Sequence, residues 1–262
     1  MDFCVIGRNI GYTLTPKLYG ELWRTTGETA VHTFGVRDLP ELAPFIEEVR
    51  SGKSSLGGFA VTSPYKVEIL SYLDEMTESV ARTGSANTVR IEPGGRLIGY
   101  NADLYGFRFT LPFSVGQAAM RALVCGTGGA SKAVRAGLDD LGISFDIVSR
   151  GSLAGEALPE GVRAFRYEEV GSLKAYTHVI NATPVGSVKI PETLLPLPYD
   201  TARPGTVFYD LNYAPPVTPF MEEGLRRGCA AVNGLSMLRT LIFDCQWPFL
   251  RDGRDGLIHG KP

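Results

Sequence analysis

Short apolar runs alternate along this chain with stretches in which apolar residues recur every three to four positions. The runs are typical of buried strands, and the recurring positions are typical of helices that bury one face. Strands are expected at residues 3–6, 31–36, 58–61, 86–91, 96–100, 145–148, 163–165, 177–181 and 206–210, in a short run that ends at residue 125, and near residues 230–232. A final helix should run from residue 235 to about 249. Strands that alternate with helices throughout predict an α/β protein.

Several helix starts carry recognisable signals. Thr15 precedes Pro16, and Thr62 lies just before Pro64, so each threonine can cap a helix whose first position is proline. Residues 38–41, which begin with Asp38 and end with Glu41, resemble a capping box. Lys66 then falls in the first turn of the third helix.

Residues 124–150 have the features of a dinucleotide-binding unit. A strand-like run ends at Cys125, and a glycine-rich turn, an amphipathic helix and a second strand follow in that order. This order is the context in which a glycine-rich turn indicates phosphate binding, because the backbone can approach a pyrophosphate at the helix start. The alternative is a purely structural turn. The predicted cofactor contacts of this turn are Gly126, Thr127, Gly128, Gly129 and Ala130.

The end of the second strand indicates which cofactor binds. Units that bind NAD usually carry an acid about 20 residues after the glycines, where it accepts hydrogen bonds from the ribose. This chain has Ser149 and Arg150 there. A guanidinium suits a phosphate dianion and can stack on adenine, so NADP(H) is predicted over NAD(H). The alternative is that Arg150 is an ordinary surface arginine.

Composition narrows the class further. A length of 262 residues suits one large domain or two of ordinary size, and a net charge of −2 gives no case for binding nucleic acid or anionic membranes. The four cysteines stand far apart, which favours buried free thiols, and the three histidines have no metal-ligand spacing, so no metal is expected. Neither a signal peptide nor an apolar stretch long enough to span a bilayer is apparent, which predicts a cytoplasmic protein.

Eight short motifs then occur in an order that resembles the shikimate dehydrogenase family, which includes quinate and aminoshikimate dehydrogenases. They lie at residues 13–16, 60–66, 84–88, 101–103, 126–130, 181–186, 210–213 and 233–238. The resemblance implies a substrate-binding lobe of residues 1–104, completed by a C-terminal helix at 237–262. It also implies a Rossmann-type NADP-binding lobe of residues 105–236, with the active site in the cleft between the lobes. The implied reaction is the reversible, NADP-dependent reduction of 3-dehydroshikimate to shikimate, by a monomer or homodimer.

The resemblance also implies roles for individual residues. Lys66 would supply the proton that ketone reduction needs, and Asp103 would orient it. Read without the family, Lys66 could be a solvated lysine and Asp103 a helix cap. The implied substrate contacts are Thr13, Thr15, Thr62, Asn87, Tyr213 and position 241. Further cofactor contacts are Asn181, Thr183 and Gly234, beside Ser149 and Arg150.

Five positions depart from the family pattern. Thr13 and Thr15 replace two serines, Ala60 replaces asparagine, and Ala102 replaces threonine. Leu241 stands where the family carries a glutamine that reaches substrate hydroxyls, and Gln246, five residues on, would face away on an α-helix.

The loss of that glutamine predicts weak shikimate turnover or a substrate with an apolar group at that point. The substrate could also be quinate, aminoshikimate or another cyclic hydroxy acid. A cofactor-binding protein without activity is a further alternative, against which the paired Lys66 and Asp103 argue.

Overall fold

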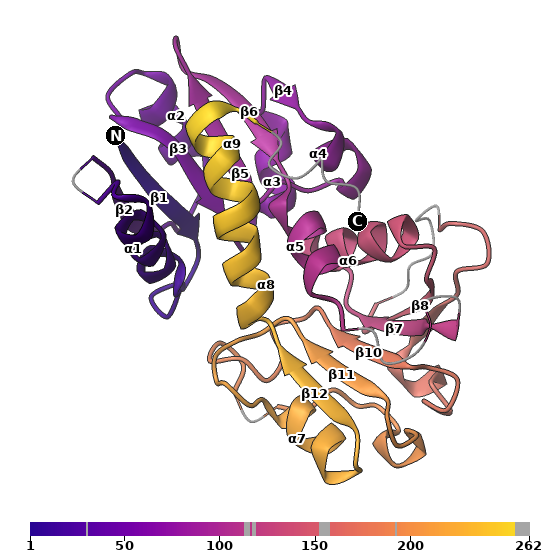
Figure 1. The fold of residues 1–262 in the computed structure, drawn as a ribbon. Helices are drawn as coiled ribbons and strands as arrows, with labels where there is room; N and C mark the ends of the chain where they lie inside the picture. Colours follow the sequence, from indigo (N-terminus) through magenta and orange to yellow (C-terminus); the bar gives the residue numbers. More distant parts are fainter. Residues whose placement is uncertain (30, 113–115, 117–118, 152–157, 192, 255–262) are drawn as a thin grey trace. The chain divides into compact units, whose positions relative to one another are not determined.

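The computed structural model describes residues 1–29, 31–112, 116, 119–151, 158–191 and 193–254. The chain forms two compact units: unit 1 comprises Met1–Phe109 and Leu238–Pro262, and unit 2 comprises Thr110–Met237. Each unit contains one six-stranded sheet with helices against it, so the predicted two-lobed α/β architecture is confirmed (Figure 1). Residues 255–262, the predicted end of the C-terminal helix, lie outside the described residues.

Unit 1 has a mixed sheet in the order β2-β1-β3-β5-β6-β4. The strands are β1 (Asp2–Gly7), β2 (Thr33–Asp38), β3 (Leu56–Val61), β4 (Glu75–Met76), β5 (Thr88–Glu92) and β6 (Arg96–Tyr100). β1 pairs in parallel with β2 and β3, whereas β5 runs antiparallel to both β3 and β6. The predicted hairpin of residues 86–100 is therefore present.

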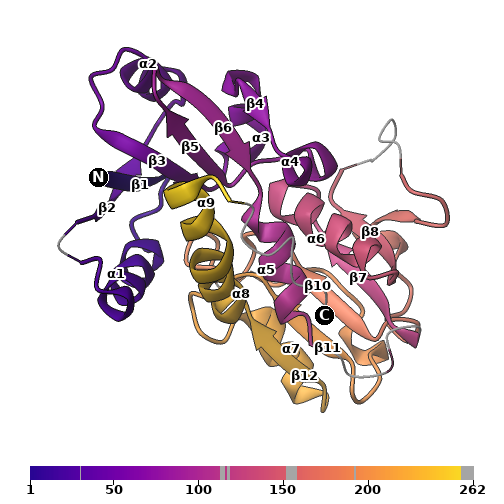
Figure 2. The ribbon, with the colours of Figure 1, turned by 45° about the horizontal axis from the view of Figure 1, so that its top comes forward.

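Helices cover both faces of this sheet, because successive strand residues point to opposite sides. The helices are α1 (Thr15–Thr26), α2 (Ala43–Arg50), α3 (Tyr65–Glu68), α4 (Glu78–Thr83), α5 (Ala102–Thr110) and α9 (Trp247–Asp252). The division between the two units, after Met237, falls within a further helix, α8 (Leu235–Thr240). Cys4 and Ile6 join the core formed with α2 and α3, while Phe3 packs its ring against Trp23 of α1 and Trp247 of α9. Figure 2 shows α2 on one side of the sheet and α1 and α9 on the other.

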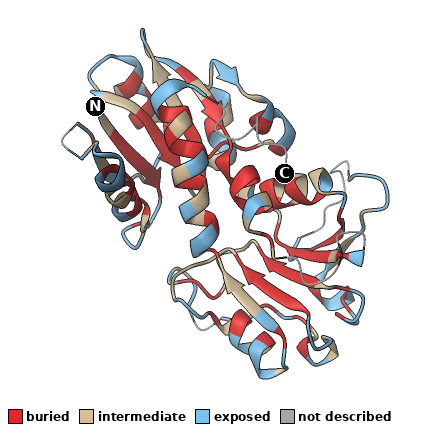
Figure 3. Cartoon of the chain, in the orientation of Figure 1, coloured by how far each residue is buried: buried red, intermediate tan, exposed pale blue. Residues whose placement is uncertain are grey.

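Unit 2 has a wholly parallel sheet in the order β12-β11-β10-β7-β8-β9. The strands are β7 (Arg121–Cys125), β8 (Ser144–Ser149), β9 (Ala164–Arg166), β10 (His178–Asn181), β11 (Val207–Asp210) and β12 (Ala230–Asn233), and the helices are α6 (Gly129–Asp140) and α7 (Pro219–Arg226). Read from β9, this is the doubly wound order of dinucleotide-binding sheets, which bind ligands where the strand order reverses. That point is at the carboxyl ends of β7 and β10. The central strands of both sheets are buried (Figure 3).

The predicted helix caps are wrong in all three cases. Leu14 is the cap residue of α1, and Thr13 rather than Thr15 supplies the hydroxyl, which accepts from the Thr15 N–H at 3.3 Å. Pro64, after a cis peptide bond, is the cap residue of α3, and no side chain caps that helix. The carboxylate of Asp38 accepts instead from Asn9 N, at 2.9 Å, because parallel pairing sets Asp38 opposite the end of β1.

The predicted final helix is interrupted. A π-helix of residues Leu241–Gln246 separates α8 from α9, and the Trp247 N–H donates to the carbonyl of Ile242, five residues back. Pro248 has no N–H for the carbonyl four residues before it, and its ring crowds that carbonyl, so a regular α-helix cannot continue through this point. The widened turn moves residue 246 relative to residue 241, with consequences for the site.

Two further findings concern the cysteines and the apolar character of the helices. All four cysteines are buried and free, as predicted. Across the described residues, no helix combines the length and the apolar character that a bilayer crossing requires.

Candidate functional site

Lys66 and Asp103 form an ion pair in unit 1. Lys66 lies on α3, a single turn that follows β3, and Asp103 lies at the start of α5, which follows β6. The Lys66 Nζ atom is 2.5 Å from Asp103 Oδ2, and their side chains are only 15% and 7% exposed. The pair that the sequence singled out therefore comes together from elements 37 residues apart.

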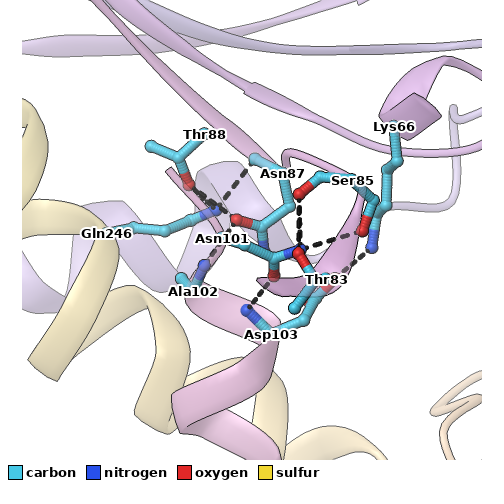
Figure 4. A network of polar contacts seen from close by, with 9 residues as sticks. All are labelled: Lys66, Thr83, Ser85, Asn87, Thr88, Asn101, Ala102, Asp103 and Gln246. Carbon is cyan, nitrogen blue, oxygen red and sulfur yellow. Dashed lines mark hydrogen bonds and ion pairs between the residues drawn. The ribbon is translucent and has the colours of Figure 1, made fainter. Parts of the chain in front are cut away.

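Asn101 holds the start of α5 in place. Its side-chain oxygen accepts from the Asp103 N–H at 3.1 Å, so Asn101 makes the capping bond and leaves the Asp103 carboxylate to Lys66. The Asn101 amide nitrogen donates to Thr83 Oγ1 and to both oxygens of Ser85, at 2.8–2.9 Å. Because every polar atom of this buried side chain is bonded, the backbone that carries Asp103 is fixed (Figure 4).

A second buried network surrounds Asn87, directly before β5. The Asn87 Oδ1 atom accepts from the Ala102 N–H at 2.8 Å and from the Thr88 hydroxyl at 2.9 Å. Gln246 donates from Nε2 to Thr88 Oγ1 at 3.0 Å and accepts from the Tyr19 hydroxyl at 3.3 Å. Figure 4 shows Asn87, Thr88 and Gln246 of this network in the same view as the Lys66–Asp103 pair.

The structure corrects the expectation about Gln246. On an α-helix, residues five apart would be about 140° apart around the axis. In a π-helix, hydrogen bonds join residues five apart, so Leu241 and Gln246 lie one above the other. Gln246 is 3% exposed, and sequence reasoning missed its place at the site because the only signal was Pro248 within the helix.

The predicted substrate-binding threonines lie on two loops of unit 1. Thr13 and Thr15 have their hydroxyl oxygens 3.0 Å apart, just before and at the start of α1. Thr62 follows β3, and its backbone N–H donates to the carbonyl of Ile6 in β1. A Cβ at Gly7 would come within 2.6 Å of the Thr62 methyl carbon, so these two strand ends approach closely only because residue 7 is glycine.

In unit 2, the glycine-rich turn joins β7 to α6. Gly126 has φ +107, and a Cβ there would come within 2.8 Å of the Thr183 methyl carbon, so this position requires glycine. The Ser131 hydroxyl donates to the Gly126 carbonyl at 2.6 Å and closes the turn, which also contains Thr127, Gly129 and Ala130. No side chain caps α6, and a Cβ on Gly128 would meet no atom within 4 Å. The 12-residue helix thus begins at open space, which fits a pyrophosphate.

Ser149 and Arg150 lie at the carboxyl end of β8. The Ser149 hydroxyl donates to the Gly151 carbonyl at 2.6 Å, and the side chain is buried. Arg150 is exposed, and no carboxylate of the described residues forms an ion pair with it. The guanidinium is therefore available to a phosphate.

Asn181 braces the loop that follows β10. Its amide nitrogen donates to the Val185 carbonyl at 3.0 Å and to Asp210, and its oxygen accepts from both the backbone and the hydroxyl of Thr183. Asp210 also accepts from Thr218 at 2.6 Å, and its burial raises its pKa to about 6. The side-chain atoms of Asn181 are thus committed within the protein, a function that the sequence alone did not reveal.

Of the remaining predicted site residues, Tyr213 and Gly234 belong to unit 2, and Leu241 belongs to the π-helix. Tyr213 is half-buried after β11, and Gly234 directly follows β12, where its N–H donates to the Asn212 carbonyl at 3.0 Å. Leu241 opens the π-helix and is 5% exposed. Among the described residues, no group of three or more potential ligands could hold a metal ion.

Comparisons with known proteins show which family this chain resembles. A family model described as the shikimate dehydrogenase substrate binding domain matches residues 5–89. The shikimate dehydrogenase (NADP(+)) of Ignicoccus hospitalis is 33% identical over 245 residues, which cover 91% of this chain and 88% of that protein.

Solved structures share the fold. Shikimate 5-dehydrogenase from Thermus thermophilus, in complex with NADP(H) and shikimate, has a TM-score of 0.80 at 27% identity, and the match covers 98% of this chain and 95% of that one. The 5-ketofructose reductase of a Gluconobacter strain has a TM-score of 0.78 at 25% identity over 97% of this chain and 94% of that one. The extent of the Ignicoccus match, together with the residues described above, shows that this chain belongs to the shikimate dehydrogenase family.

Proposed function

We propose that this chain is an NADP-dependent dehydrogenase that reversibly reduces 3-dehydroshikimate to shikimate. The observation that carries the proposal is the Lys66–Asp103 pair, 2.5 Å apart and largely shielded from water, in a chain of this family. A protein that only bound a cofactor would have no need of a shielded proton donor. The reaction needs one, because a reduced ketone becomes an alkoxide that must be protonated.

The residues of unit 1 transfer the proton and bind the substrate. Lys66 donates a proton from Nζ to the developing alkoxide oxygen during reduction and accepts it during oxidation, while Asp103 holds the ammonium group in position. Asn87 donates a hydrogen bond to a substrate oxygen. The hydroxyls of Thr13 and Thr15 bind the substrate carboxylate, and Thr62 binds a ring hydroxyl.

The residues of unit 2 would hold NADP(H), which supplies the hydride when bound. The open start of α6 at Gly128 suits the pyrophosphate, and the exposed Arg150 suits the 2′-phosphate. Asn181 and Thr183 shape the neighbouring loop rather than offering free side-chain atoms. We expect the enzyme to act in the cytoplasm, as a monomer or homodimer.

A second candidate rests on Leu241. This buried apolar side chain occupies the place of a polar family residue, which favours a substrate that lacks a hydroxyl there, such as a related cyclic hydroxy acid. The similarity to a 5-ketofructose reductase is consistent with a broader range of ketone substrates on this fold.

A substrate panel tests the proposal. Purified enzyme is assayed with shikimate, quinate and an aminoshikimate in the oxidative direction, and with 3-dehydroshikimate and 5-ketofructose in the reductive direction, each with phosphorylated and unphosphorylated cofactor. The highest kcat/KM should belong to shikimate and 3-dehydroshikimate with NADP(H). Lys66→Ala should abolish turnover, while Lys53→Ala, at an exposed lysine of the same unit, should not. A higher kcat/KM for another substrate would favour the second candidate, and no turnover at all would refute both.

A further inference from the structure

Four side chains of unit 1 form a hydrogen-bonded series that ends at Asn87. The Tyr19 hydroxyl donates to Gln246 Oε1, Gln246 Nε2 donates to Thr88 Oγ1, and the Thr88 hydroxyl donates to Asn87 Oδ1. All four residues are at most 3% exposed. Their distances of 2.9–3.3 Å lie within or near the normal hydrogen-bond range.

The direction of each bond is fixed by backbone groups at both amides. The Ala102 N–H can only donate, so the Asn87 atom that faces it must be the oxygen. The Asn87 carbonyl can only accept, so the Gln246 atom 3.3 Å from it must be the nitrogen. The orientation of both amides therefore follows from chemistry rather than from an arbitrary assignment.

One group at the end of this series has no acceptor. The Asn87 Nδ2 atom donates to no other residue in the part of the chain that the structure describes, although its oxygen is bonded twice. Each upstream donor polarises the next bond in the same direction, which strengthens the final N–H as a donor. The amide nitrogen is thus available to donate to the oxygen of a ligand.

We propose that Thr88 and Gln246 are positioning residues for substrate binding: they orient the Asn87 amide so that it donates to a substrate oxygen. The inference rests on the function proposed above, in which Asn87 contacts substrate. The inference also gives a reason for the π-helix, because that turn places the Gln246 amide within hydrogen-bond distance of Tyr19, Asn87 and Thr88. Without the Thr88 hydroxyl, only the Ala102 N–H would hold the Asn87 oxygen.

Thr88→Val tests this directly, because valine has the same shape and lacks the hydroxyl. The KM for shikimate should rise about five- to tenfold, the loss of roughly one hydrogen bond, while kcat changes less than threefold. The KM for NADP should not change. Thr88→Ser, which keeps the hydroxyl, should restore the KM, and Gln246→Glu, which cannot donate to Thr88, should raise it. Thr33→Val, at an exposed threonine of β2, is the matched control.

An Asn87→Ala background separates positioning from a structural effect. If Thr88 acts through Asn87, Thr88→Val should leave the KM of the Asn87→Ala enzyme unchanged, whereas independent effects would multiply. An unchanged KM in the single Thr88→Val variant would overturn the inference, and so would a multiplied effect on the KM in the Asn87→Ala/Thr88→Val variant. In either case the proposed function still stands if the wild-type enzyme turns over shikimate. Absence of wild-type turnover with shikimate and 3-dehydroshikimate overturns the proposed function and this inference together.

Discussion

Replacing Lys66 by methionine should show how much the Lys66–Asp103 pair contributes to kcat and how much it contributes to the stability of the fold. Methionine keeps the length of the side chain and removes the charge, so Asp103 would be left unpaired at 7% exposure. Breaking a buried pair costs about 3–5 kcal/mol and an exposed pair about 0.2–1 kcal/mol. With Lys66 at 15% exposure, this pair lies between these limits, and a loss of about 2 kcal/mol is expected. That corresponds to a fall in Tm of about 4–8 °C.

The effect of Lys66→Met on kcat should be larger than its effect on stability, and a second substitution at Asp103 should not reverse it. Loss of general acid–base catalysis lowers kcat by about 10²- to 10⁴-fold. Adding Asp103→Asn removes the unpaired charge, so the Lys66→Met/Asp103→Asn enzyme should regain most of the lost stability while its turnover stays low. Thermal melts and steady-state kinetics with 3-dehydroshikimate and NADPH measure the two effects, and titration with NADP should give an unchanged Kd in every variant. A Lys66→Met enzyme with kcat within tenfold of wild type would refute the assigned role of the lysine.

Three other predictions follow from residues outside this pair. Arg150→Ala should raise the KM for NADP at least about tenfold, the loss of one charge-assisted phosphate contact, and leave the KM for NAD unchanged; equal effects on both cofactors would count against a 2′-phosphate site. Leu241→Gln should raise kcat/KM for shikimate about tenfold, and no gain would remove Leu241 as the cause of altered specificity. Burial alone would raise the pKa of Asp146, but bonds from Arg163, Tyr176 and Arg121 outweigh it and hold that pKa at about 2. The stability it contributes is therefore present above about pH 4 and lost as pH falls toward 2, so urea unfolding of Asp146→Asn should show a weaker acid dependence than wild type.

The sequence predicted those parts of the molecule that depend on neighbouring residues. The unit of β7, α6 and β8 follows from local periodicity, and the glycine at position 126 follows from the backbone conformation that its turn requires. Lys66 and Asp103 are each ambiguous in isolation. Their pairing was predicted only through the family resemblance, because 37 residues separate them and no local pattern records a contact.

The parts that were missed depend on contacts distant in sequence. Asp38 was expected to cap the helix that follows it, but the pairing of β1 with β2 offers it the backbone of Asn9 instead. Gln246 was dismissed on α-helical spacing, whereas Pro248 and the buried acceptors near Asn87 favour a wider turn. In both cases the side chain was expected to interact within its own helix or at its start, whereas its hydrogen-bond partner lies on a segment distant in sequence.

The return of the chain to unit 1 sets an order of events during synthesis. The residues of unit 2 are contiguous, so that unit can complete its sheet as soon as Met237 has left the ribosome. Unit 1 must wait, because Trp247, which packs against Phe3, Trp23 and His32, is made more than a hundred residues after the sheet it completes. Gln246 arrives on the same segment. A nascent or truncated chain that ends before this helix therefore lacks both the ring of Trp247 in the aromatic core and the hydrogen bond from Gln246 to Thr88. If Asn87 is oriented as we propose, substrate recognition should begin only when nearly all of the described chain has been made.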